Sequence, residues 1–160
     1  MARRSSLPVQ RLVQKTPEPQ KWTARMMQLA AFVASWSKDP STKVGAVVVG
    51  RDRRMVAIGY NGFPEGIADY PERLMDREVK YKLTQHAERN VIDNAQFDLT
   101  GATLYVTMHP CTECSKSIVS KKIARVVCPP AISREPWASD AEWSKKILQE
   151  AGVSLEISGG

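Results

Sequence analysis

The apolar positions of the chain first form a helical pattern near its start. Between Trp22 and Trp36 they cover more than one stripe of a helix, which predicts a well-buried helix. Residues 37–40, Ser-Lys-Asp-Pro, end this helix, because the residue before a proline disfavours the α conformation. Residues 1–20 hold three prolines and little apolar pattern, so we expect a flexible basic arm ahead of one domain, residues 21–160.

A strand pattern follows the first helix. Residues 44–49 and 55–59 are short β-rich runs, and the polar turn 50–54 between them predicts a β-hairpin. Residues 62–80 then combine glycines, prolines and mixed charge, which predicts a long loop. Loops of this length inside a compact domain are often functional.

From about residue 84 onward, helical and strand patterns alternate. Helices are expected at 84–95, 111–121 and 140–150, and strands at 102–107, 125–128 and 153–157. A hairpin followed by this alternation implies a mixed five-stranded sheet with helices on both faces, a three-layer α/β/α domain.

Composition narrows the setting of this domain. The net charge of +6 is compatible with nucleic-acid binding, but basic residues outside the arm are spread along the chain, which favours an ordinary basic protein without a nucleic-acid partner. No apolar run approaches the ~20 residues needed to cross a bilayer, so we expect no membrane partner. Three cysteines, two of them three residues apart, suit metal binding in a reducing compartment, and a cytoplasmic location is expected.

Two short segments have the residue types of a metal site: His86-Ala87-Glu88 and Pro110-Cys111-Thr112-Glu113-Cys114. Cysteines three apart share one face of a helix, and we expect both in the first helical turn with the proline at the first helical position. A helix N-terminus lowers thiol pKa values, which favours the thiolate that binds zinc. We expect the histidine in the first turn of its own helix. Two thiolates and one imidazole leave the fourth tetrahedral position of Zn²⁺ for water, as catalytic zinc sites require.

Glu88 completes the predicted chemistry. It lies two residues beyond His86 and can point toward the open position. Zinc can bring the pKa of water from ~15.7 to about 7. The carboxylate would accept the water proton and pass it to a ring nitrogen, then to a departing amine. Positioned proton transfer of this kind contributes about 10²–10⁴-fold.

The main alternative is a structural zinc site or a catalytically silent zinc-binding or nucleic-acid-binding module. A structural site needs a fourth protein ligand, and Cys128 and His109 are the remaining cysteine and histidine. Cys128 ends an apolar strand, which favours a buried, inert thiol. His109 precedes Pro110, so it is expected to line a pocket, with its backbone carbonyl able to accept a hydrogen bond from a leaving amine. Glu88 favours the enzyme, because a structural site has no use for that carboxylate.

Further blocks of sequence extend the pattern beyond the metal motif. They are Ser-Lys-Asp-Pro-Ser-Thr-Lys-Val-Gly-Ala at 37–46, Gly-Tyr-Asn-Gly at 59–62, Lys-Tyr at 80–81 and Gly-Ala-Thr-Leu-Tyr-Val-Thr at 101–107. With the H-x-E…P-C-x-x-C motif of zinc nucleobase deaminases, the chain resembles the deoxycytidylate deaminase branch of the cytidine deaminase superfamily over about residues 22–157.

This resemblance implies a cytidine-deaminase-like fold and the hydrolysis of dCMP to dUMP and ammonia, which feeds thymidylate synthesis in pyrimidine metabolism. It implies one catalytic zinc per chain on His86, Cys111 and Cys114, with Glu88 as proton shuttle. It further implies two substrate contacts, Asn61 to the sugar and the Ala87 backbone amide to the base carbonyl. Lys43, Lys80 and Arg89 are candidates for the phosphate by their charge and their proximity to the motifs, and His109 is expected in the pocket.

Regulation is also implied by the resemblance. Gly59, Tyr60 and Gly62 resemble a block near an allosteric nucleotide in family members, which are activated by dCTP and inhibited by dTTP; Mg²⁺ would accompany such an effector. Many members are hexamers, so a homo-oligomer is expected. The chain departs from the usual family pattern at residues 67–69, Ile-Ala-Asp, and at Val91.

Other members of the superfamily are the remaining alternatives. One is a deaminase of dCTP or 5-modified dCMP, and another is a tRNA adenosine deaminase. The Gly-Tyr-Asn-Gly block and the long loop favour a free nucleotide over tRNA as substrate.

Overall fold

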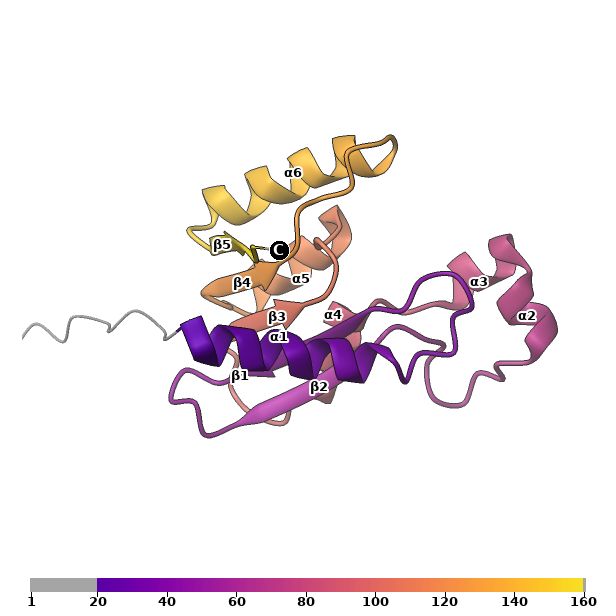
Figure 1. Cartoon of the computed structure of the whole chain (residues 1–160), viewed down its shortest axis with the longest axis horizontal. Coiled ribbons are helices and arrows are strands. Elements are labelled where there is room, and N and C mark those ends of the chain that lie inside the picture. Colours follow the sequence, from indigo (N-terminus) through magenta and orange to yellow (C-terminus); the bar gives the residue numbers. More distant parts are fainter. Residues whose placement is uncertain (1–19, 160) are drawn as a thin grey trace, which may run out of the picture.

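The computed structural model describes residues 20–159. It has a five-stranded sheet in the order β2-β1-β3-β4-β5, flanked by helices (Figure 1). β1 pairs antiparallel with both β2 and β3, while β3, β4 and β5 run parallel. The predicted mixed five-stranded sheet is therefore confirmed. The strands are β1 Gly45–Val49, β2 Val56–Tyr60, β3 Thr103–Val106, β4 Arg125–Cys128 and β5 Ser154–Ile157. The helices are α1 Gln20–Ala34, α2 Pro71–Met75, α3 Arg77–Leu83, α4 Ala87–Asn94, α5 Thr112–Ser120 and α6 Trp137–Glu150.

Helices cover both faces of the sheet, as predicted (Figure 1). α1 packs over β1 and its neighbours, where Ala30, Val47 and Tyr105 are fully buried in a small core. The other face carries the larger core, in which α4, α5 and α6 contribute Val91, Ile118 and Leu148. The zinc motifs therefore lie on helices whose apolar faces pack against the sheet.

Several predicted boundaries were wrong. The predicted arm, residues 1–20, lies outside the described residues except for Gln20, which begins α1. α1 ends at Ala34, two residues earlier than expected. Residues 84–86 are not helical, because a β-bridge between Gly62 and Gln85 holds this segment extended until α4 begins at Ala87. α6 begins at Trp137, three residues before the expected start.

The predicted long loop 62–80 forms two short helices instead: α2 lies within it, and α3 begins within it and continues to Leu83. Pro71 occupies the start of α2, and the Asp76 side chain accepts a hydrogen bond from the Val79 backbone N–H to cap α3. These are ordinary helix-start signals. The prediction failed because we gave the glycines and prolines of the segment more weight than these helix-start signals. In addition, neither helix has a buried apolar residue that would create a periodic pattern in the sequence.

β2 is an edge strand, and α4 blocks part of its open edge. Asn90 and Asn94, one helical turn apart, donate side-chain hydrogen bonds to the backbone carbonyls of Tyr60 and Ile58. Gly59 between them lets the strand approach the helix closely: a Cβ at this position would lie 2.5 Å from the Val91 nitrogen. This contact places α4, and with it the His86-Ala87-Glu88 segment, at a defined distance from the sheet.

Gly59→Ala is therefore expected to destabilise the protein by about 1–3 kcal/mol, because the added methyl group overlaps the backbone of α4. The free energy of unfolding in denaturant would measure the loss. Gly62→Ala is the matched control, since a Cβ there meets nothing within 4 Å. Equal stability of the two variants would contradict the packing role assigned to Gly59.

No helix in the described part of the chain is both long and apolar enough to cross a membrane.

Candidate metal centre

His86 is the N-cap residue of α4. Its backbone is extended, with φ −68° and ψ 154°, and its side chain makes no capping hydrogen bond. It follows the Gly62–Gln85 bridge directly, so the bridge sets its backbone position. The prediction placed His86 inside the first turn; the structure moves it one residue before the helix, where the ring can face the neighbouring helix.

Cys111 is likewise an N-cap residue, that of α5, and its Sγ accepts a hydrogen bond from the Cys114 backbone N–H at 3.5 Å. The expectation that Pro110 would be the first helical residue is wrong, since the helix begins at Thr112. The correction has a chemical consequence. A thiolate at the N-cap replaces the usual capping oxygen and meets the positive end of the helix dipole.

The three side chains converge on one point. Nδ1 of His86 lies 3.5 Å from Cys111 Sγ and 3.4 Å from Cys114 Sγ, and the ligand atoms all lie within 4.8 Å of one another. A tetrahedral ion with Zn–S of about 2.3 Å and Zn–N of about 2.0–2.1 Å would hold the nitrogen about 3.5–3.6 Å from each sulfur. The donor types and these separations therefore fit zinc.

The three ligand side chains also shift one another's pKa values. A hydrogen bond from Cys114, partly opposed by burial, and another from His86 lower the pKa of Cys111 to about 4. The hydrogen bond between Cys114 and Cys111, the burial of Cys114 and the charge of Glu88 raise the pKa of Cys114. The Cys111 thiolate raises the pKa of His86 to about 9 despite burial. A bound divalent cation reverses both increases, because metal ligation requires thiolates and a neutral imidazole.

Glu88 is buried beside this cluster, with 4% of its surface exposed. Burial raises the pKa of its carboxyl to about 7, against the opposing effects of its backbone N–H and the charge on His86. A carboxyl group buried in the first turn of α4 with no ion-pair partner among residues 20–159 is costly unless it has a function. Its electrostatic contacts are with the three predicted ligands, and its role as a proton carrier stays a prediction.

The structure separates Cys128 from the metal ligands. It is fully buried at the end of β4 and does not belong to the metal-binding group found among the described residues. Burial raises the pKa of its thiol to about 12. His109 also stays outside the group. Its Nδ1 lies 3.0 Å from the Pro110 carbonyl oxygen, while Nε2 is buried and has no hydrogen-bond partner among residues 20–159.

The other predicted substrate contacts, besides His109, lie on three segments. Ala87 is the first residue of α4, so its backbone N–H has no acceptor within the helix. Asn61 is buried and bonds to backbone: Oδ1 accepts from Val44 N–H and Nδ2 donates to the Thr42 carbonyl. Lys43 lies between those two residues and is exposed.

The residues predicted to lie near an effector nucleotide, Gly59, Tyr60 and Gly62, each contact another part of the domain. Gly59 contacts α4 as described above, and Gly62 pairs with Gln85. Tyr60 is 40% exposed and packs edge-to-face on Trp36, with ring centroids 6.1 Å apart. Their role near a nucleotide stays a prediction.

Sequence reasoning missed Asp140, which supports the cysteine turn from α6. Its carboxylate accepts a hydrogen bond from the Thr112 backbone N–H at 3.0 Å, and its backbone carbonyl accepts one from the Thr112 hydroxyl. Thr112 lies between Cys111 and Cys114 in the chain. Asp140 therefore holds the helix start from which both thiols point toward the metal site. No local signal could have revealed it, because the contact spans 28 residues.

Comparison with known proteins decides the family. The family of the cytidine and deoxycytidylate deaminase zinc-binding region matches residues 20–129, which include all three ligands and Glu88. The chain is 37% identical over 142 residues to deoxycytidylate deaminase of Pongo abelii, covering 84% of this chain and 78% of that protein. The chain belongs to the cytidine and deoxycytidylate deaminase family.

Other members of this deaminase family agree. A protein of Aliivibrio fischeri described as an uncharacterized deaminase in the luxG 3' region is 41% identical over 139 residues, covering 84% of this chain and 92% of that protein. The structure of dCMP deaminase from the cyanophage S-TIM5, in complex with dCMP and dUMP, covers 89% of this chain and 100% of its own, with a TM-score of 0.69 and 24% identity. That likeness confirms the fold expected of a deaminase in this family.

Family membership also identifies the metal. The matched stretch is a zinc-binding region, and the side chains that it brings together here are His86, Cys111 and Cys114. This deaminase therefore has the ligands of a catalytic zinc, and their three-residue set leaves one tetrahedral position for a reactant.

Proposed function

We propose that this protein hydrolyses dCMP to dUMP and ammonia, supplying dUMP for thymidylate synthesis. One observation carries the proposal: a buried carboxyl group, Glu88, stands beside a three-ligand metal cluster. The substrate assignment is supported by the deoxycytidylate deaminases among its relatives, such as that of Pongo abelii. Free thiols at all three cysteines support a cytoplasmic location for this activity.

The chemistry divides between the metal and the chain. Zinc, when bound, supplies a Lewis acid that makes water a nucleophile near neutral pH. Glu88 takes one proton from the water and passes it to the ring nitrogen of the base. It then takes the remaining proton from the added hydroxyl group and gives it to the departing amine. The oxygen of water thereby replaces the amine on the base, and ammonia leaves. The burial of Glu88 excludes bulk water from the proton path.

The residues around the metal would orient the nucleotide. The Ala87 backbone N–H at the start of α4 has no acceptor within that helix, which suits it to the base carbonyl. Asn61 has an amide N–H beyond its bond to Thr42 and would give it to the sugar. The exposed ammonium of Lys43 would meet the phosphate. The half-buried His109 would line the pocket, with its backbone carbonyl facing the leaving amine.

An ammonia-release screen tests the substrate assignment. Purified protein would be offered dCMP, CMP, dCTP, cytidine and 5-methyl-dCMP at equal concentrations, and tRNA in a separate reaction. We expect the highest kcat/KM with dCMP. A clear preference for dCTP or the methylated nucleotide would move the assignment within the family, whereas turnover of tRNA adenosine and none of these would overturn it.

Regulation belongs to the same proposal. We propose a homo-oligomer, a hexamer, in which dCTP with Mg²⁺ activates and dTTP inhibits through the Gly59, Tyr60 and Gly62 region. A true effector must bind two conformations unequally, with a coupling of typically about 1–3 kcal/mol. The expected result is a sigmoidal dCMP curve that dCTP makes hyperbolic. A hyperbolic curve that the triphosphates alter only by competition would remove this regulation and leave the deaminase intact.

A further inference from the structure

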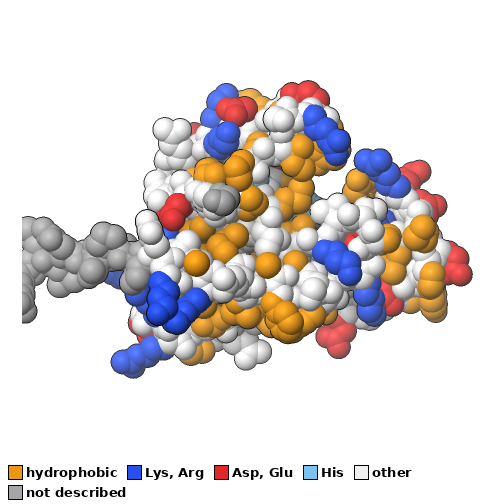
Figure 2. Space-filling view, viewed as in Figure 1, with side chains coloured by type: hydrophobic (Ala, Val, Ile, Leu, Met, Phe, Trp, Pro, Cys, Tyr) orange, Lys and Arg blue, Asp and Glu red, His pale blue; other side chains and the backbone are white. Residues whose placement is uncertain are grey.

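The segment of residues 62–84, which contains α2 and α3, is attached to the domain in an unusual way. It projects from the side of the sheet (Figure 1), and the surface is hollowed between this segment and α6 (Figure 2). α2 and α3 pack mainly against each other. α2 has no buried residue, and the one buried residue of α3 is a lysine, Lys80. Apolar packing therefore contributes little to holding the segment in place.

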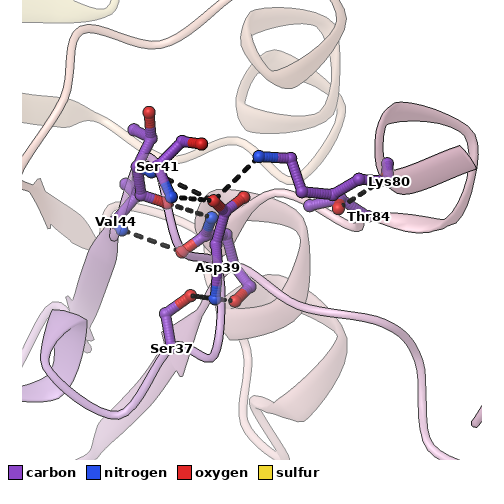
Figure 3. Close-up of polar contacts among 8 residues, drawn as sticks. Ser37, Asp39, Ser41, Val44, Lys80 and Thr84 are labelled. Atoms are coloured by element: carbon purple, nitrogen blue, oxygen red, sulfur yellow. Dashed lines mark hydrogen bonds and ion pairs between the residues drawn. The ribbon is translucent and has the colours of Figure 1, made fainter. Parts of the chain in front are cut away.

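A buried ion pair takes the place of that packing. Lys80 Nζ lies 3.0 Å from Asp39 Oδ1, and both side chains are more than nine-tenths buried. In Figure 3 the lysine reaches from its helix to the aspartate in the loop between α1 and β1. A second ion pair that joins the segment to the rest of the described chain, Lys38–Asp69, is exposed on both sides. Exposed pairs contribute little, whereas removing one partner of a buried pair leaves an uncompensated charge.

Asp39 links the ion pair to the loop that contains Lys43. The same Oδ1 accepts hydrogen bonds from the backbone N–H groups of Ser41 and Thr42. Burial alone would raise the pKa of Asp39, but these two N–H groups and Lys80 hold it below its ordinary value, so the carboxylate stays charged. The turn at residues 39–42 is thus closed around one charged oxygen.

Asn61 then joins this turn to the metal centre. Its amide bonds to the Thr42 carbonyl and the Val44 N–H, one on each side of Lys43, and Ser37 donates its hydroxyl to the Asn61 carbonyl. The next residue, Gly62, pairs with Gln85, which precedes the zinc ligand His86. One continuous set of polar contacts therefore runs from Lys80 through the turn at 39–42 to the backbone beside the metal.

We propose that Lys80 and Asp39 are a positioning pair for substrate binding. Their ion pair fixes the turn of residues 39–44, and this turn sets where Lys43 and Asn61 lie relative to the metal centre. Neither residue touches the reacting atoms. The inference rests on the proposed function for the identity of the substrate, while the structural link from Lys80 to the turn stands independently of it.

Lys80→Met removes the ammonium while keeping much of the side-chain volume. Misplacement of a binding loop by about 1 Å can cost up to about 100-fold, so we expect the KM for dCMP to rise about 10- to 100-fold. We expect kcat to stay within about threefold and zinc at about one per chain, because the ligands and Glu88 lie outside the turn. Lys80→Arg should recover most of the loss. Lys82→Met is the matched control, since Lys82 lies on the same helix in an exposed pair with Glu78.

Two further readouts separate positioning from general structure. In a Lys43→Ala background, adding Lys80→Met should raise KM much less than in wild type, because the contact that the pair positions is already gone. Amide hydrogen exchange at Thr42 and Val44 should be faster in Lys80→Met than in Lys82→Met, with no substrate present. This second readout tests the structural link even if the protein prefers another nucleotide.

If Lys80→Met is poorly folded, Lys80→Met combined with Asp39→Asn avoids an unpaired buried charge and keeps an acceptor for the Ser41 and Thr42 N–H groups. Unchanged KM and unchanged hydrogen exchange in the folded variant would overturn the proposal. So would a parallel loss of zinc, thermal stability and kcat, which would show a merely structural pair. An inactive wild-type protein with faster exchange in Lys80→Met would refute the substrate assignment and retain the link from Lys80 to the turn.

Discussion

Glu88→Gln is expected to abolish turnover while the zinc stays in place. The amide has nearly the size of the carboxyl group but cannot carry a proton between water and the base. Loss of positioned proton transfer costs about 10²–10⁴-fold in kcat, and loss of the charge beside the attacking water adds to it. Because Glu88 is not among the three metal ligands, zinc content by atomic absorption should remain about one per chain.

The control for this experiment is Glu113→Gln. Glu113 lies between the two cysteines in sequence but is exposed and pairs with Lys116 on the same helix. Its amide variant should keep wild-type kcat and zinc. Near wild-type turnover by Glu88→Gln would remove this residue from the mechanism and would require another proton carrier in the site.

Removal of a zinc ligand is expected to have the second large effect. Cys114→Ala leaves Cys111 and His86, and two side chains cannot form the three-ligand set of a catalytic zinc. We expect zinc content well below one per chain after dialysis and deamination below detection. Thermal stability should fall as well, because a metal that binds only the folded state stabilises it by mass action. Wild-type protein stripped by a chelator should show the same two losses and regain activity with added Zn²⁺.

Cys128→Ala separates this effect from the loss of any cysteine. Both thiols are buried, but Cys128 lies at the end of β4, outside the ligand group. We expect it to keep zinc and activity and to lose some stability through the small cavity left in the core. Loss of zinc in Cys128→Ala, with activity retained in Glu88→Gln, would identify the site as structural and contradict the deaminase mechanism.

The sequence alone determined the elements whose signals are local. The five strands were predictable because each is a short β-rich run between turn residues, and their alternation with helices implied the mixed sheet. The metal ligands were predictable for a similar reason. Cys111 and Cys114 are three residues apart and so lie on one side of a helix start, and the His86-Ala87-Glu88 segment supplies the histidine ligand beside the carboxyl group within three residues.

Only the tertiary structure decided how these local pieces meet. The bridge from Gly62 to Gln85 ends the predicted helix early and makes His86 an N-cap residue, although nothing in residues 84–86 forbids a helix. Asp140 reaches Thr112 across 28 residues, and Lys80 reaches Asp39 across 41. A buried lysine looks like any surface lysine in a sequence, because its burial depends on the presence of a carboxylate far along the chain. For that reason the ligands of the metal were readable from the sequence, and the contacts that position them were not.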